Sequence, residues 1–219
     1  MTEFAGIVRT CYPDGQLKEI YFENRGKKEG EYKEYRMNGK LLKICTYVDW
    51  KEEGEYKEYH KNGQLYSITN YVDGKEEGEY KAYYSVNGQL CVICNLVNGQ
   101  QHGELKQYRE NGQLCLTTNY VDGKQEGEYK TYWSNGQIRL ICNYIDGQKH
   151  GECKQYYENG QLMDICNYVD GKEEGKYIKY HENGHIYYEC NFVDGKMEGG
   201  YKLPQDNGQF LHKYNYINM

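Results

Sequence analysis

Residues 62–83 read NGQLYSITNYVDGKEEGEYKAY, from Asn62 to Tyr83. The dipeptides Asn62-Gly63 and Asp73-Gly74 both accept the positive φ angles that tight hairpin turns require. A strand-sized segment, residues 64–72, lies between them, and a second one, residues 78–83, follows. The stretch therefore predicts two short antiparallel strands with a tight turn before each.

This stretch recurs along the whole chain. The turn glycines fall 24 residues apart, with one step of 25. They are Gly15, Gly39, Gly63, Gly88, Gly112, Gly136, Gly160, Gly184 and Gly208. A fixed period of this size indicates stacked supersecondary units. We predict an all-β fold, an elongated, solenoid-like single sheet of successive antiparallel β-hairpins. About eight to nine units would form one domain, residues 1–219.

Both ends depart from the pattern. The chain has two prolines, Pro13 and Pro204, and each lies near one terminus. Proline removes a ladder donor and is tolerated at sheet edges, where an open stack needs blunted strands. We therefore predict an N-terminal cap in residues 1–14 and a C-terminal cap in residues 200–219.

The first strand of each unit alternates in character. Even positions after the turn glycine carry Leu or Ile, then a Cys or Thr, then mostly Tyr, and should share one face. The Cys/Thr column contains Cys45, Thr69, Cys94, Thr118, Cys142, Cys166 and Cys190. Hairpin stacking would keep equivalent residues ~9.6 Å apart, too far for a disulfide. We interpret these thiols as free, small side chains in one structural niche.

The second strand does not alternate simply. Tyr56 and Tyr59 are three residues apart, and other units repeat this spacing. Either a β-bulge intervenes, or each face of the sheet takes one tyrosine. The sequence leaves both arrangements open.

Composition narrows the function classes. The net charge is −6, with acidic and basic residues interspersed, which argues against nucleic acid and against strong attraction to anionic lipid. Residues 1–12 contain no long apolar run, and no stretch approaches the ~20 apolar residues of a membrane helix. Reduced thiols fit a cytoplasmic protein. We expect a soluble, cytoplasmic chain.

Two common catalytic motifs are absent from the sequence. It contains neither a nucleotide-binding loop nor a G-x-S-x-G pattern. A calcium loop needs several ligands at alternate positions before its glycine, and one acid precedes Gly74. We expect no enzyme activity, no catalytic or cofactor-binding residues and no metal site.

Positions that vary between units are better candidates for function, because repeat proteins bind through variable positions on a constant frame. The third residue after the turn glycine varies, as does the residue after the last tyrosine of the second strand. Together with Trp50, which replaces a turn glycine, they give the candidate interaction residues Trp50, Tyr66, Trp133, Tyr157 and Tyr187. The alternative is drift on an unconstrained surface. At Trp50 the turn must change type or gain compensation from the indole ring.

The pattern N-G-Q-L, N-Y-V-D-G-K and E-G-E-Y-K-x-Y, as in residues 111–132, resembles the variant form of the MORN repeat. The resemblance covers about residues 6–210. It implies successive β-hairpins, a role in protein scaffolding and, in some members, attachment to membranes. We expect a non-catalytic scaffold that binds a protein partner or itself. The alternatives are a peripheral phospholipid-associating module and an antitoxin-like binding protein, a label given to similar repeats.

Overall fold

The computed structural model describes residues 5–204 and 210–213. The chain divides into two compact units, Met1–Gly112 and Gln113–Met219, and each is described by itself. The assignment of 1–219 to one domain stays a prediction. So do the two caps, and parts of them, residues 1–4, 205–209 and 214–219, lie outside the described residues.

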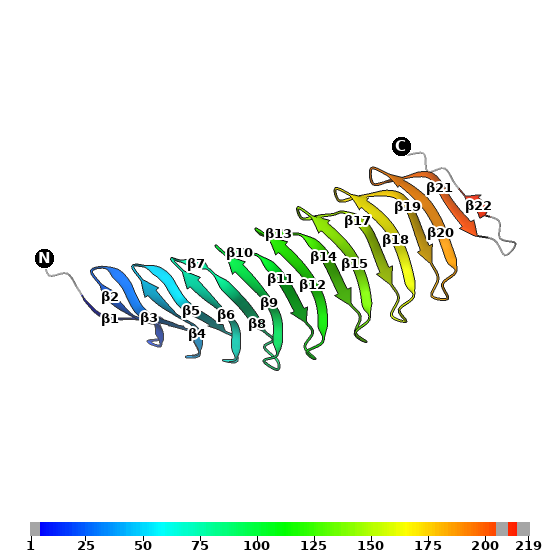
Figure 1. The fold of residues 1–219 in the computed structure, drawn as a ribbon. Coiled ribbons are helices and arrows are strands. Elements are labelled where there is room, and N and C mark those ends of the chain that lie inside the picture. Colours follow the sequence, from blue (N-terminus) through cyan, green and yellow to red (C-terminus); the bar gives the residue numbers. More distant parts are fainter. Residues whose placement is uncertain (1–4, 205–209, 214–219) are drawn as a thin grey trace. The chain divides into compact units, whose positions relative to one another are not determined.

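The first unit consists of strands that follow one another along the sheet (Figure 1). They are β1 (Ala5–Cys11), β2 (Leu17–Asn24), β3 (Lys27–Tyr35), β4 (Leu41–Val48), β5 (Lys51–Tyr59), β6 (Leu65–Val72), β7 (Lys75–Glu76), β8 (Gly78–Tyr83), β9 (Leu90–Val97), β10 (Gln100–Gln101) and β11 (Gly103–Tyr108).

The second unit repeats this arrangement. Its strands are β12 (Leu114–Val121), β13 (Lys124–Gln125), β14 (Gly127–Tyr132), β15 (Ile138–Ile145), β16 (Gln148–Lys149), β17 (Gly151–Tyr156), β18 (Leu162–Val169), β19 (Lys172–Tyr180), β20 (Ile186–Val193), β21 (Lys196–Pro204) and β22 (Phe210–Lys213). Nine strands of the chain thus begin two residues after a turn glycine, as predicted.

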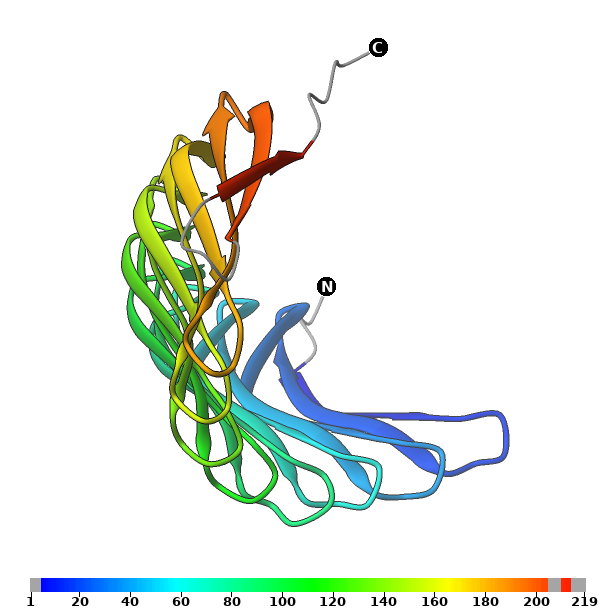
Figure 2. The same ribbon diagram turned by 90° about the vertical axis from the view of Figure 1, so that its right-hand side faces the viewer.

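The strands form one antiparallel sheet of successive hairpins that is not closed into a barrel. The predicted all-β hairpin fold is therefore confirmed. Within each unit, turns of one kind lie along one edge and turns of the other kind along the opposite edge (Figure 2). We call these the Asn-Gly edge and the Asp-Gly edge. Among the described residues, no helix has the length and apolar character needed to cross a membrane.

The two turns differ in construction. Asp73 and Gly74 have φ angles of 54° and 78°, the signature of a two-residue type I′ turn. The Asn-Gly connection is a three-residue loop, because the amide of His60 donates to the carbonyl of Gln64 at 2.8 Å. Of its residues only Gly63 has a positive φ, while the Asn62 side chain accepts a bond from the Gln64 amide. Tight turns therefore occur at both dipeptides, as predicted, but they are of different types.

Alternation places the core on one face of the first strands. Cys45 and Tyr47 are buried, whereas Thr46 and Val48 between and beyond them are exposed. All seven residues of the Cys/Thr column are buried, with exposed fractions of 3–7%. In the first unit, Tyr32, Cys45 and Tyr47 form a core cluster. The niche predicted from the sequence is confirmed, and burial raises the pKa of the Cys45 thiol to about 11.

One buried cysteine lies outside the Cys/Thr column predicted from the sequence. Cys153 occupies the second-strand position that holds Tyr129 and Tyr177 in flanking repeats. It lies opposite Cys166 on β18 and packs in one buried cluster with Cys142 and Cys166. A hydrogen bond from Cys153 lowers the pKa of Cys142. The distance between repeats therefore does not keep these three thiols apart. None of the nine cysteines forms a disulfide.

Of the two arrangements considered for the second strand, the structure shows the second, because the β5 bulge lies before Tyr56 and not between Tyr56 and Tyr59. Between β4 and β5 the register jumps from Ile44 paired with Lys57 to Thr46 paired with Glu53, so a bulge precedes Tyr56. Gly54 accommodates it with a φ of 76°. In four repeats the bulge divides the second strand, giving the short strands β7, β10, β13 and β16. Tyr56 then packs against the core cluster, whereas Tyr59 lines an open cleft.

Candidate interaction surface

The first variable column consists of bulge residues. Where β5 meets β6, Glu58 pairs with Ser67 and Tyr59 pairs with Leu65, which leaves Tyr66 as the extra residue. The same irregularity leaves out Lys18, Leu42, Cys91, Arg139, Met163 and Tyr187. A bulged residue has no directly paired neighbour in the ladder, so its side chain is less constrained. Tyr66 and Tyr187 are exposed by 42% and 46%.

The second variable column is chemically constrained despite its variety. Trp133 donates from Nε1 to the carbonyl oxygen of Tyr156 in the next repeat, at 2.9 Å. Equivalent bonds of 2.7–2.8 Å join Tyr12 to Tyr35, Arg36 to Tyr59, His60 to Tyr83, Tyr84 to Tyr108 and Tyr157 to Tyr180. Every member offers a donor at the end of a long side chain. The column therefore bonds successive repeats together along the Asn-Gly edge.

The two variable columns touch one another. The rings of His60 and Tyr66 lie 4.9 Å apart, and those of His181 and Tyr187 lie 4.7 Å apart. Arg139 lies over the ring of Trp133 at 4.9 Å. Residues of one variable column thus contact residues of the other, and both columns lie on the same edge of each unit.

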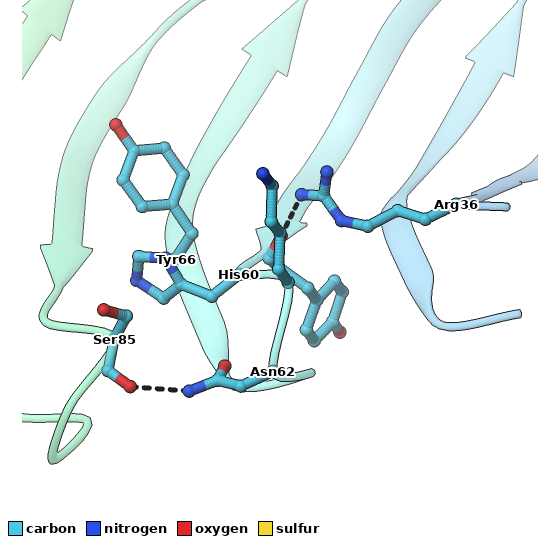
Figure 3. Close-up of a pocket in the computed structure, with 7 residues that line it drawn as sticks. Arg36, His60, Asn62, Tyr66 and Ser85 are labelled. Carbon is cyan, nitrogen blue, oxygen red and sulfur yellow. Dashed lines mark hydrogen bonds between the residues drawn. The ribbon is translucent and has the colours of Figure 1, made fainter. Parts of the chain in front are cut away.

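An open cleft of about 510 Å³ lies on the Asn-Gly edge of the first unit (Figure 3). Its lining residues are Arg36, Tyr59, His60, Lys61, Asn62, Tyr66 and Ser85. Figure 3 shows the Tyr66 ring standing beside the His60 imidazole, and Asn62 bonded to the backbone of Ser85. The cleft contains an arginine, a lysine and a histidine but no carboxylate.

Hydrogen bonds hold the basic side chains in place. His60 Nε2 lies 2.8 Å from the carbonyl oxygen of Tyr83. Because a carbonyl only accepts, Nε2 carries the proton and Nδ1 is left for another contact. Arg36 uses Nη2 for the Tyr59 carbonyl, while its Nε is buried without a partner. Lys40 adds a further ammonium, bonded to the Asn62 carbonyl at 2.9 Å.

Other hollows, with volumes of about 280–510 Å³, recur along the hairpins. One of about 300 Å³ is lined by Ile93, Cys94, Asn95 and neighbouring Glu and Lys side chains, and one of about 280 Å³ repeats the pattern around Ile141. Their residues are those that recur from repeat to repeat. We therefore regard these hollows as part of the repeated scaffold. The cleft at Tyr66 differs from them because it is lined by residues that vary between repeats.

Trp50 lies on the Asp-Gly edge, away from the cleft. Asp49 and Trp50 have φ angles of 52° and 73°, so the turn keeps its type although the glycine is missing. The Trp50 amide reaches the Lys28 carbonyl at 3.4 Å, whereas Gly74 and Gly147 make the equivalent bonds at 3.0 and 2.9 Å. The indole is 46% exposed. Of the two alternatives posed by the sequence, a change of turn type does not occur.

The candidate residues therefore fall into three environments. Tyr66 and Tyr187 are exposed on the Asn-Gly edge of their units, and Trp50 is exposed on the other edge. Trp133 and Tyr157 are half-buried, with their polar atoms bonded to the next repeat. The selected set omitted Arg36, His60 and Lys61. The signal for the first two was already present, because they belong to the second variable column.

The polar groups around the cleft are mainly basic and neutral. Within residues 5–204 and 210–213, no group of three or more His, Cys, Asp or Glu side chains is arranged to hold a metal ion. The cleft holds no carboxylate next to His60 that could orient it as a base. The arrangement suits recognition of another molecule.

The fold places the chain in the class of repeat proteins that form an open sheet from successive β-hairpins. The family model described as a MORN repeat variant matches residues 28–49, 52–73, 101–122, 125–146, 149–170 and 173–194. These six copies cover more than half of the chain, and the chain belongs to this family. Between residues 28 and 194, the longest stretch without a match is residues 74–100, which contain the extra residue of the 25-residue step.

Solved structures give distant and partial matches. The crystal structure of TarM is 13% identical, with a TM-score of 0.30, and the match covers 44% of this chain and 19% of that one. A GtfA/B complex bound to UDP and GlcNAc is 14% identical, with a TM-score of 0.19, and the match covers 65% of this chain and 24% of that one. The crystal structure of TcdB2-TccC3-Cdc42 is 14% identical, with a TM-score of 0.25, and the match covers 97% of this chain and 14% of that one.

This chain thus spans less than a quarter of each of these structures. A comparison with curated proteins finds no match.

Proposed function

We propose that this protein is a non-catalytic scaffold that binds another protein, or a second copy of itself, through the Asn-Gly edge. One observation carries the proposal: two variable columns meet on that edge and leave aromatic side chains exposed, on a frame of recurring turns and strands. Exposed aromatic residues next to polar groups are typical anchors of protein interfaces. We place the protein in the cytoplasm, in keeping with its free thiols.

Membership of a MORN family supports a binding role and does not specify the ligand. A phospholipid-associating module is the second candidate, and the net charge of −6 opposes it. An antitoxin-like protein would be a special case of the first proposal, with a toxin as the partner.

The test is capture from the native source, using the full chain and Tyr66→Ser. We expect specific partners, or a second copy of the chain in cross-linking, to be retained by the wild type and lost with the variant. Ile7→Ser is the control, because Ile7 is 58% exposed and lies on β1, outside both variable columns. Equal recovery with Tyr66→Ser would contradict the proposal.

Liposome flotation separates the second candidate. The scaffold proposal predicts that the chain stays in the soluble fraction with neutral and anionic vesicles. Binding to vesicles that persists at high salt would favour the membrane module instead.

A further inference from the structure

The cleft at Tyr66 contains a lysine at a position that is neutral or acidic in the other repeats. The residue after the second variable column is Pro13, Met37, Lys61, Ser85, Glu110, Ser134, Glu158 and Glu182 in successive repeats. Lys61 is the basic member of this series. It stands beside His60 and Arg36, in a chain whose net charge is −6.

The repeat is also irregular in length at this place. The step of 25 inserts one residue into the loop that follows β8. There the Gly88 amide reaches back to the carbonyl of Tyr84 across a longer loop, and Val86 is 74% exposed. Ser85 of the same loop forms one wall of the cleft, and its carbonyl accepts the bond from Asn62 at 2.6 Å. Charge and shape therefore both change here, on a frame that is otherwise repetitive.

The second unit contains a natural comparison. His181 and Tyr187 repeat the ring contact of His60 and Tyr66. There, Tyr157 replaces Arg36 and Glu182 replaces Lys61. The aromatic frame is the same, and the basic residues are absent. Compared with the site at Tyr187, the first-unit cleft therefore has the basic groups needed to hold a negative group.

We propose that the cleft formed by Arg36, His60, Lys61 and Tyr66 binds an acidic segment of a partner protein. Carboxylates of the segment take the ammonium of Lys61 and the free donors of Arg36, and an adjoining apolar or aromatic side chain packs on the ring of Tyr66. No carboxylate lines the cleft, and the nearby Glu34 pairs with Lys43. The volume of about 510 Å³ suits a few side chains.

The inference rests on the proposed scaffold function, since it names the chemistry of the partner. Charge-assisted hydrogen bonds to guanidinium and ammonium groups are stronger than neutral ones. They also weaken as salt screens them, which gives the proposal a second signature.

The experiment titrates the full chain into two fluorescein-labelled peptides, followed by fluorescence anisotropy. One peptide carries four Glu around a Phe, and the other has Gln in place of each Glu. We expect the acidic peptide to bind at least about tenfold more tightly, and to weaken as salt rises. A shift of the His60 ring resonances on adding the acidic peptide would place it at the cleft.

Two variants keep the stack intact. Lys61→Glu introduces the residue that other repeats carry at this position. Arg36→Tyr introduces the neutral donor of Tyr12, Tyr84 and Tyr157, which preserves the bond to the next repeat. Each should weaken the acidic peptide about tenfold. Lys75→Glu makes the same charge change on the Asp-Gly edge and should leave binding unchanged.

Equal binding of the two peptides, or binding indifferent to Lys61→Glu and Arg36→Tyr, would overturn the inference. So would binding of anionic vesicles at the cleft without binding of the acidic peptide. If capture of a native partner depends on Tyr66 and not on Lys61 or Arg36, the scaffold function stands and this inference fails. If capture is independent of Tyr66, the proposed function fails whatever the peptide titration shows.

Discussion

The indole Nε1 of Trp133 donates a 2.9 Å hydrogen bond to the carbonyl oxygen of Tyr156, 23 residues later. Six residues of four types make the same kind of bond at this position, so the column varies in identity and keeps one structural role. A second column, made of bulge residues, contacts the first and carries the exposed aromatic groups. The proposed binding residues and the residues that bond successive repeats therefore lie side by side on one edge.

Trp133→Phe should destabilise the chain by about 1–2 kcal/mol, because it leaves the half-buried Tyr156 carbonyl without its donor. Urea unfolding followed by circular dichroism measures the change. Trp50→Phe is the matched control, since the Trp50 indole is exposed and makes no hydrogen bond in the described part of the chain; a change below about 0.5 kcal/mol is expected there. Equal effects of the two substitutions would contradict the bonding role of Trp133.

Thr69→Val should stabilise the chain by about 1 kcal/mol. The Thr69 hydroxyl is buried and has no hydrogen-bond partner, so the isosteric valine removes an unsatisfied group. Thr10→Val is the control, because the Thr10 hydroxyl donates to Glu19 at 3.3 Å and its loss should lower stability slightly. A lower melting temperature for Thr69→Val would show that the hydroxyl is satisfied in solution.

Trp50→Gly should stabilise the chain by about 1 kcal/mol, because Trp50 holds a φ of 73° that glycine adopts without strain. The reverse change, Gly26→Trp in the preceding Asp-Gly-edge turn, should cost a similar amount. Gly26 has a φ of 74° and open space around it, so strain is tested without a clash. A fall in melting temperature for Trp50→Gly would mean that the indole packs within the stack. If a partner binds at that edge, its affinity should fall with this variant.

Stability should fall as the pH rises above about 9. Burial raises the pKa of Cys45 to about 11, and that of Tyr71, Tyr80 and Tyr144 to about 12, above their ordinary values of 9.0 and 10.0. A raised folded-state pKa contributes stability that is complete below the unfolded value and is lost as the pH passes the folded value. Urea midpoints at pH 7, 9 and 11 measure this, and an unchanged midpoint at pH 11 would contradict it.

The thiols should behave as free structural groups. At pH 8, iodoacetamide should label the exposed Cys11 first and leave Cys45 and Cys190 protected, because both are buried and burial raises their pKa to about 11. Peptide mass spectrometry gives the order of labelling. Reductant and chelator should leave the melting temperature unchanged. A drop of many degrees with either reagent would reveal disulfides or a bound metal.

Local sequence was enough to predict the hairpins. Asp-Gly sets both φ angles of its turn, and alternation at Cys45 and Tyr47 sets the buried face, so the strands and the core column follow from neighbouring residues alone. The repeat then extends this local rule along the chain. The candidate surface was predicted only in part: variable positions were found, but their environments were not.

Tertiary structure decided the environments, because they depend on residues about 23 positions away. Trp133 and Tyr66 look equally free in sequence, yet one is bonded to the next repeat and the other is a bulge residue in an open cleft. Likewise, Cys153 joins the thiol column only because strand pairing places it opposite Cys166. Turn chemistry acts over a few residues and is legible in the sequence, whereas register between strands determines which side chains meet.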